Sequence, residues 1–176
     1  MKTQNQTMLS ENTLTSRPTD IIAGFPVRPG FFELNGATPL SNGVNFTTHT
    51  RHGTSCELLL FHSGEEEPFA VLPFPNACRI GDVYSMIVMG LDIEDLEYGY
   101  RIDGPYEPEK GHIFDKTKVL LDPYAKAVAG QRKWGQQKIG SYHARVVRDS
   151  FDWEDMPQST RKISDLIIYE LHVRGF

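Results

Sequence analysis

An aromatic side chain at the end of a strand is the first candidate for chemistry in this sequence. Tyr98, Tyr100 and Ile102 stand at alternate positions, as in a strand, and the turn 103–105, Asp-Gly-Pro, separates them from Tyr106. An aromatic ring beside a turn can stack on a sugar ring, whereas its more common role is ordinary packing. Tyr106 is therefore a candidate sugar platform, with packing as the alternative.

A run of acidic residues is the second candidate. Asp92, Glu94 and Asp95 lie within residues 91–97, and paired carboxylates can serve as general acid and base. Acidic runs more often face the solvent. We interpret this run as a solvated loop between two strands.

Histidine and cysteine give little indication of a metal site. His112 lies in a Gly-His-x-Phe motif with no second histidine at ligand spacing, so a structural role is favoured. Glu170 and His172 alternate and would share one face of a strand, an arrangement that metal sites sometimes use. Cys56 and Cys78 stand singly, which argues against a disulfide framework or a zinc site. The sequence predicts no metal and no cofactor.

Length and charge exclude several classes of protein. A chain of 176 residues can bury one good core, and a net charge of -5 argues against a nucleic-acid partner. No stretch approaches the roughly 18 to 20 consecutive apolar residues of a membrane span. Residues 1–16 lack the apolar centre of a secretory signal. We therefore expect no membrane partner and a cytoplasmic location.

The elements that must position these side chains are short strands. Apolar runs recur about every ten residues between Gly, Pro and Asn turns, which is typical of an all-β, antiparallel β-sandwich. Asp122 and Pro123 match the N-cap and first position of a helix, which predicts one helical turn through Val128. The expected core consists of apolar strand residues whose facing the sequence leaves open: Val44, Phe46, Leu58, Leu60, Val83, Tyr98, Tyr100 and Ile102.

Composition divides the chain into four parts. Residues 1–20 are polar and predict a flexible tail, and residues 21–129 form the predicted sandwich. Residues 130–165 lose the strand rhythm and are expected to form a connecting arm, which Trp134 and Trp153 would anchor to the sandwich. Residues 166–176 are apolar enough to suit a buried strand of a parallel sheet.

Five blocks in this order resemble the N-terminal region of isoamylase-type glycogen debranching enzymes. The first four resemble the family 48 carbohydrate-binding module, and the last resembles the first strand of the glycoside hydrolase family 13 barrel. The blocks are Gly43-Val44-Asn45-Phe46, residues 98–106 (YGYRIDGPY), Gly111-His112-x-Phe114, residues 120–125 (LLDPYA) and residues 169–176 (YELHVRGF).

The resemblance implies an immunoglobulin-like sandwich attached to a barrel that hydrolyses α-1,6 branch linkages of glycogen or starch. Such a (β/α)₈ barrel takes about 250 residues, and only residues 166–176 follow Asp165. The family's catalytic carboxylates lie on later barrel strands, so no catalytic residue is assigned. We expect a truncated fragment that is inactive by itself, whose partners are the missing catalytic barrel and, as a further candidate, glycogen or starch.

The resemblance also assigns roles to single residues. Tyr106 falls where glucan-binding relatives place a tryptophan, and Gly99 falls where they place a lysine, so direct glucan contact and packing against the barrel both stay open for Tyr106. A barrel-interface or structural role is expected for His112, Asp122, Tyr124, Glu170, His172 and Arg174.

Two alternatives remain from other classes of protein. The chain could be a stand-alone glucan-binding module, or a sandwich that binds protein. Self-association through residues 166–176 belongs to the second alternative, because an unpaired apolar strand readily pairs with a neighbour.

Overall fold

The computed structural model describes residues 17–130, 142–148, 152, 154 and 160–175. Most of the predicted tail, together with Trp134 and Trp153, lies outside the described residues. No helix among the described residues is long and apolar enough to cross a membrane.

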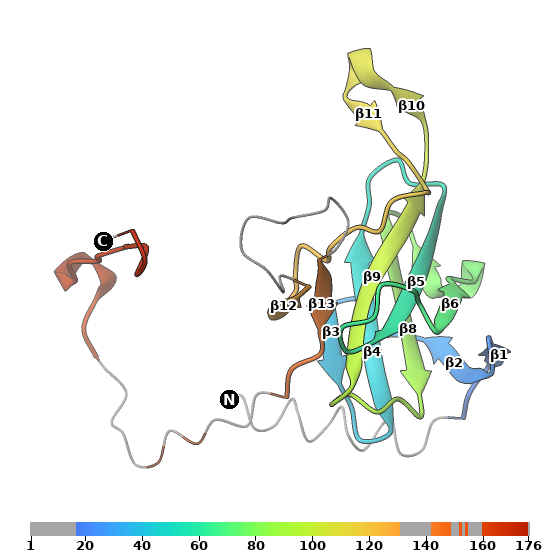
Figure 1. Cartoon of the computed structure of the whole chain (residues 1–176), viewed down its shortest axis with the longest axis horizontal. Coiled ribbons are helices and arrows are strands. Elements are labelled where there is room, and N and C mark those ends of the chain that lie inside the picture. Colours follow the sequence, from blue (N-terminus) through green and yellow to red (C-terminus); the bar gives the residue numbers. More distant parts are fainter. Residues whose placement is uncertain (1–16, 131–141, 149–151, 153, 155–159, 176) are drawn as a thin grey trace.

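The described chain folds into two antiparallel sheets that face each other (Figure 1). The first has the order β1-β2-β8-β4-β3, and β7 also pairs with β8. Its strands are β1 Asp20–Ile22, β2 Phe25–Pro29, β3 Gly36–Pro39, β4 Gly43–His49, β7 Arg79–Ile80 and β8 Val83–Met89.

The second sheet has the order β12-β13-β9-β5-β6, and a separate hairpin, β10-β11, projects beyond β9 (Figure 1). Short 3₁₀ helices, η1 Asn76–Cys78, η2 Pro108–Lys110 and η3 Ile163–Asp165, complete the described elements. The strands are β5 Ser55–His62, β6 Ala70–Pro73, β9 Leu96–Asp103, β10 Tyr106–Glu107, β11 His112–Ile113, β12 Ala127–Ala129 and β13 His143–Arg145. The all-β, antiparallel sandwich that the sequence predicts is confirmed.

The core lies between the two sheets and follows the alternation of the strands. Phe46 of β4 meets Tyr98 of β9 across the sandwich, with ring centroids 5.1 Å apart. The predicted core residues are buried, except Val83, which is partly buried because it begins β8, where its partners His49 of β4 and Ile80 of β7 are both exposed. The apolar positions of the strands therefore predicted core residues, and the structure shows that alternate ones face inward.

The helical turn predicted from Asp122 to Val128 is wrong. The Tyr124 N–H donates to the Asp122 carboxylate at 2.8 Å, and the Ala125 N–H donates to the Asp122 carbonyl at 3.0 Å, which closes one tight turn. The chain then enters β12 at Ala127, which pairs with Arg145 of β13. Strand pairing with a distant segment replaces the helix that the local signal favours.

The sandwich extends past the boundary predicted at residue 129. Strand β13 lies between β12 and β9, and its Ala144 pairs with Val128 on one side and Tyr98 on the other. His143, Ala144 and Val146 are buried. Part of the predicted arm therefore belongs to the second sheet.

The apolar C-terminal segment, residues 166–173, forms no strand in this structure. Ile167, Tyr169 and Val173 are 89%, 85% and 89% exposed, and the segment lies apart from the sandwich (Figure 1). A strand requires a hydrogen-bonded neighbour, and none of the described strands pairs with this segment. The predicted barrel strand is thus extended, unpaired and exposed.

Candidate functional site

The β10-β11 hairpin carries Tyr106 and is anchored at its base. Strand β9 ends at Asp103, and the ring of Phe114 then lies against Gly104, where an added Cβ would be 2.6 Å from Cγ of Phe114. Phe114 itself packs against the core. Lys110 pairs with Glu107 at 3.1 Å near the hairpin tip, but both side chains are exposed, so this pair adds little stability.

Tyr106 and Ile113 form an exposed apolar platform on this hairpin. They are direct cross-strand partners and therefore share one face. Tyr106 is 71% exposed and Ile113 is 69% exposed. The predicted sugar platform is thus an open surface that a ligand can reach, and the described residues do not bury it.

His112 lies on the other face of the hairpin. It pairs with Glu107, and its ring makes an edge contact with the ring of His52, 4.6 Å away. Among the residues that the structure describes, no group of three His, Cys, Asp or Glu side chains could hold a metal ion. The contact with His52 gives His112 a structural position between the hairpin and the loop at residues 51–54.

The position of Gly99 is covered by the chain itself. Leu120 forms a two-bond bridge to Tyr100, with N–H to carbonyl distances of 2.7 and 3.0 Å. This bridge places Val119 over Gly99, where an added Cβ would be 2.7 Å from Cγ1 of Val119. A side chain at position 99 would therefore require Val119 to move.

Asp122 is a buried anchor for the turn that follows this bridge. It is 1% exposed and accepts a 2.8 Å hydrogen bond from the Tyr98 hydroxyl. Burial raises the pKa of the Asp122 carboxyl, and the hydrogen bonds from the Tyr124 N–H and the Tyr98 hydroxyl oppose this rise. The Tyr124 carbonyl lies over Gly36, whose φ of +81° suits glycine.

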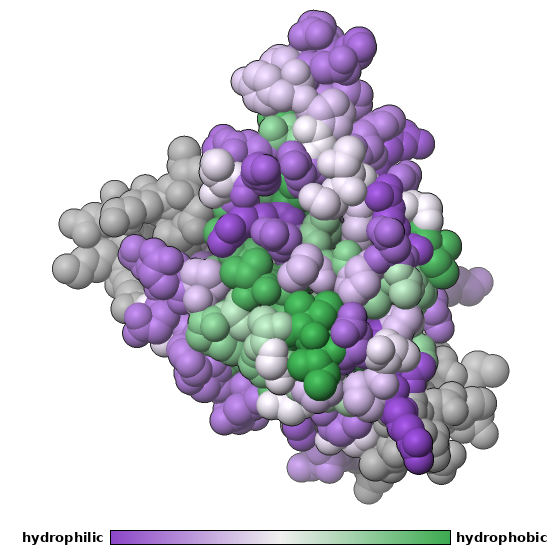
Figure 2. Space-filling model, turned by 90° about the vertical axis from the view of Figure 1, so that its right-hand side faces the viewer, coloured by the Kyte–Doolittle hydropathy of each residue, from purple (hydrophilic) through white to green (hydrophobic). Residues whose placement is uncertain are grey.

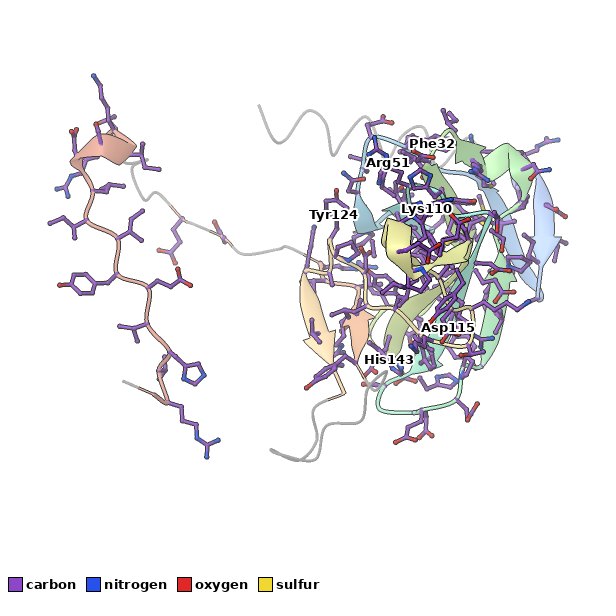
Figure 3. The ribbon with its side chains drawn as sticks, turned by 90° about the horizontal axis from the view of Figure 1, so that it is seen from above. Phe32, Arg51, Lys110, Asp115, Tyr124 and His143 are labelled. Atoms are coloured by element: carbon purple, nitrogen blue, oxygen red, sulfur yellow. The ribbon has the colours of Figure 1, made fainter. Side chains whose placement is uncertain are left out.

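Exposed apolar residues lie on both sides of this anchor in the sequence, within residues 120–128, and we call them the apolar strip. Leu120, Leu121, Tyr124 and Val128 are 40%, 39%, 47% and 52% exposed. In Figure 3, Tyr124 lies at the side of the molecule that carries β12 and β13. Asp122 is therefore held inside while its apolar neighbours face outward.

The remaining predicted residues are not brought to the hairpin. Glu170, His172 and Arg174 lie in the exposed C-terminal segment, apart from the sandwich (Figure 1). The Gly175 N–H donates to Nδ1 of His172 at 3.0 Å within a local turn. Without a strand, the alternation of Glu170 and His172 defines no shared face.

A buried pair between Glu97 and His143 escaped the sequence interpretation. Their side chains are 3% and 5% exposed, and the Glu97 carboxylate lies 3.1 Å from Nδ1 of His143. Gly64 N–H also donates to Glu97, at 3.0 Å, and Phe61 stacks on His143 at 3.8 Å. The pair fastens β13 to β9, at the place where Figure 3 labels His143.

A signal for the strand that carries His143 was present in the sequence. Tyr142, Ala144 and Val146 alternate around His143, as in a half-buried strand. The rest of the acidic run agrees with the loop interpretation, since Asp92, Glu94 and Asp95 are exposed and precede β9.

The family to which the chain belongs follows from comparison with known proteins. Residues 35–125, just over half of the chain, match the family described as carbohydrate-binding module 48 (isoamylase N-terminal domain). The chain belongs to this family. The matched range begins just before β3 and ends after the Asp122 turn, so it contains the Tyr106 platform, the covered Gly99 and the buried Asp122.

Curated relatives of this carbohydrate-binding module 48 chain are much longer proteins. Isoamylase SU1 of Zea mays is 34% identical over 89% of this chain and 20% of its own length. The glycogen debranching enzyme of Salmonella typhi is 36% identical over 80% of this chain and 23% of its own length. The chain thus spans about a fifth of the length of these relatives.

Solved structures give a weaker likeness. A type I pullulanase from Bacillus subtilis in complex with maltose matches with a TM-score of 0.48 and 20% identity, over 73% of this chain and 15% of that one. At this level the comparison carries no argument of its own, and the sandwich rests on the strand pairing described above.

Proposed function

We propose that this carbohydrate-binding module 48 chain is the N-terminal, non-catalytic part of a glycosidase that hydrolyses α-1,6 branch linkages of glycogen or starch. The observation that carries the proposal is the similarity of 34% and 36% to an isoamylase and a glycogen debranching enzyme over most of this chain. The module would position the catalytic domain and contact the polyglucan.

Two exposed apolar segments support contact with a catalytic barrel. The strip at residues 120–128 presents Leu121 and Tyr124 beside the buried Asp122, which fixes their backbone. Residues 166–173 expose Ile167 and Ile168 at 89% and 74%. Exposed apolar surface of this kind marks a site of interaction, and the catalytic barrel is the partner that we propose for both.

Catalysis is not expected from the chain alone. Hydrolysis of a glycosidic bond needs two carboxylates that flank it, and a barrel of about 250 residues would exceed the whole chain. We expect the purified chain to release no reducing ends from glycogen. Measurable branch hydrolysis by the purified chain would contradict this part of the proposal.

Direct contact with glucan is proposed at the Tyr106 platform. The phenol ring is 71% exposed beside Ile113 and can stack on a glucose ring. We expect the chain to sediment with glycogen and Tyr106→Ala to lose most of this binding. Tyr124→Ala, which removes the same side chain from another exposed position, is the matched control. Retention of full binding by Tyr106→Ala would exclude the platform.

The stand-alone glucan-binding module is the second candidate, because Tyr106 is accessible without any catalytic domain. Binding of glycogen by the isolated chain, together with no gain when a catalytic domain is joined to it, would favour this candidate. The cytoplasmic location stays a proposal, since the name of the maize relative specifies the chloroplast.

A further inference from the structure

A hollow lies at the end of the sandwich opposite to the hairpin. Its volume is about 240 Å³, and it is lined by Phe25, His62, Phe69, Leu96 and residues 90–92 and 95. We propose that this hollow binds one glucose residue of an α-glucan chain, at a site separate from the Tyr106 platform.

The length of β9 sets the distance between the hollow and the Tyr106 platform. Strand β9 begins at Leu96, in the wall of the hollow, and ends at Asp103, just before the hairpin. Its eight residues at about 3.3 Å each place the two sites roughly 25 Å apart. The same glucose residue cannot occupy both.

Aromatic rings form one wall of the hollow. The rings of Phe25 and Phe69 lie 6.2 Å apart at 53°, and the His62 ring stacks on Phe69 at 4.4 Å and 29°. Phe69 is nevertheless 41% exposed. Figure 2 faces the side that carries β1, β2 and β6 and shows an apolar area bordered by polar side chains. A ring that is held firmly but left partly open can stack on the C–H face of a sugar.

Carboxylates form the polar part of the hollow. The Asp95 carboxylate accepts hydrogen bonds from the Ser63 N–H at 3.0 Å and from Nδ1 of His62 at 2.8 Å. These bonds, that from Ser63 first, lower the pKa of the Asp95 carboxyl. Asp92 accepts a bond from the Glu94 N–H at 3.1 Å. Each carboxylate oxygen can accept a further bond, so both residues can receive sugar hydroxyls.

The lining also limits the class of ligand. No Lys or Arg is among the residues that line the hollow, whereas two carboxylates are, so the lining disfavours phosphate and other anions. Its volume is below the roughly 300 Å³ of the smallest common ligand pockets, which suits one ring of a chain that continues into solvent. A cationic ligand would compete with His62 for Asp95, whereas a neutral polyol adds to the existing bonds.

The test is a titration of the full chain with maltotriose, followed by amide chemical shifts in NMR spectra. We expect two separate groups of shifts, one in the hairpin at residues 107–113 and one at residues 63–64 and 90–95. Phe69→Ala should remove the second group and weaken that site about tenfold or more, which corresponds to ~1.4 kcal/mol. Tyr106→Ala should remove only the first group.

Matched variants separate the proposal from other outcomes. Ile80→Ala removes another exposed apolar side chain (63% exposed) outside the hollow and should leave both groups of shifts intact. Asp92→Asn keeps a hydrogen-bond acceptor and should cost a neutral sugar little, while a cationic ligand would lose affinity and respond to salt. Absence of shifts at 63–64 and 90–95 in the parent chain overturns the proposal, whether or not the hairpin binds.

If Phe69→Ala binds maltotriose at residues 63–64 and 90–95 as tightly as the parent chain does, the proposed site in the hollow is also overturned. If the parent chain shows shifts at these residues but none in the hairpin, only the Tyr106 platform is contradicted. The two proposals therefore fail by different results. A thermal unfolding curve for each variant shows that Phe69→Ala still folds, as we expect for a side chain that is 41% exposed.

Discussion

Replacement of Gly99 by alanine tests whether residue 119 really covers this strand. Gly99 lies in the interior of β9, outside the left-handed region of backbone angles, so alanine meets no backbone strain there. If no new contact were crowded, alanine would stabilise the fold by about 0.4 to 1 kcal/mol, because it lowers the conformational entropy of the unfolded chain. The substitution becomes destabilising only if the new methyl group is crowded by its neighbours.

The space around the new methyl group is already filled. The new Cβ would lie 2.7 Å from Cγ1 of Val119 and 3.2 Å from the Leu120 carbonyl oxygen. The Leu120 carbonyl is bonded to Tyr100 and cannot easily retreat. Overpacking of this kind costs about 1 to 3 kcal/mol. After subtraction of the gain above, we expect Gly99→Ala to lower the free energy of unfolding by about 1.3 kcal/mol at the midpoints of the two ranges, within limits of roughly 0 to 2.6 kcal/mol.

Urea unfolding of four chains measures this effect. The set contains the parent, Gly99→Ala, Val119→Ala and the double variant, which together form a double-mutant cycle. Val119→Ala removes the methyl that meets the new Cβ and leaves the 3.2 Å contact with the Leu120 carbonyl oxygen, so Gly99→Ala should cost less in that background than in the parent. If Gly99→Ala costs the same in both backgrounds, Val119 does not cover Gly99.

Three further predictions concern buried groups and the C-terminal segment. Because the folded pKa of Asp122 lies above its ordinary value of 3.8, the folded state binds its proton more tightly. The stability that this group contributes should therefore fall as the pH rises from 3.8 through the raised pKa, and Asp122→Asn should flatten this slope in urea unfolding; equal slopes would contradict it. Burial raises the pKa of Cys78 to about 11 and raises that of Cys56 further, so neither thiol should react with a thiol reagent at neutral pH until the chain unfolds. Fast labelling of the folded chain would show that burial is incomplete. Exposed residues 166–173 should make the chain associate as its concentration rises in sedimentation velocity, and Ile167→Lys with Ile168→Lys should abolish this; a parent that stays monomeric would contradict it.

The sandwich was predictable because its strands follow local rules. Alternation around Val44, Leu58 and Tyr100 identifies strands that pack their inward faces against a second sheet, and the structure buries all three. Val83–Met89 is another such strand, and most of its residues are buried. The exposure of Tyr106 after the turn agrees with a candidate ligand-binding ring.

Long-range pairing accounts for what the sequence interpretation missed. The Asp122-Pro123 signal for a helix is local, and pairing of Ala127 with Arg145 overrides it. The buried carboxylate of Glu97 belongs to an acidic run that otherwise faces solvent, and only the fold brings His143 to it. The hollow combines Phe25 of β2, Phe69 just before β6 and the distant loop at residues 90–95, so spacing along the chain gives no sign of it.

The central claim, that the chain supports the catalytic domain of a debranching enzyme, is tested most directly in a chimera. This chain would replace the similar N-terminal region of the Salmonella typhi glycogen debranching enzyme, to which it is 36% identical. We would measure reducing ends released from glycogen by the chimera and by the same enzyme without this region. We expect clear debranching by the chimera and a marked loss without the region. A folded chimera that is no more active than the shortened enzyme would contradict it.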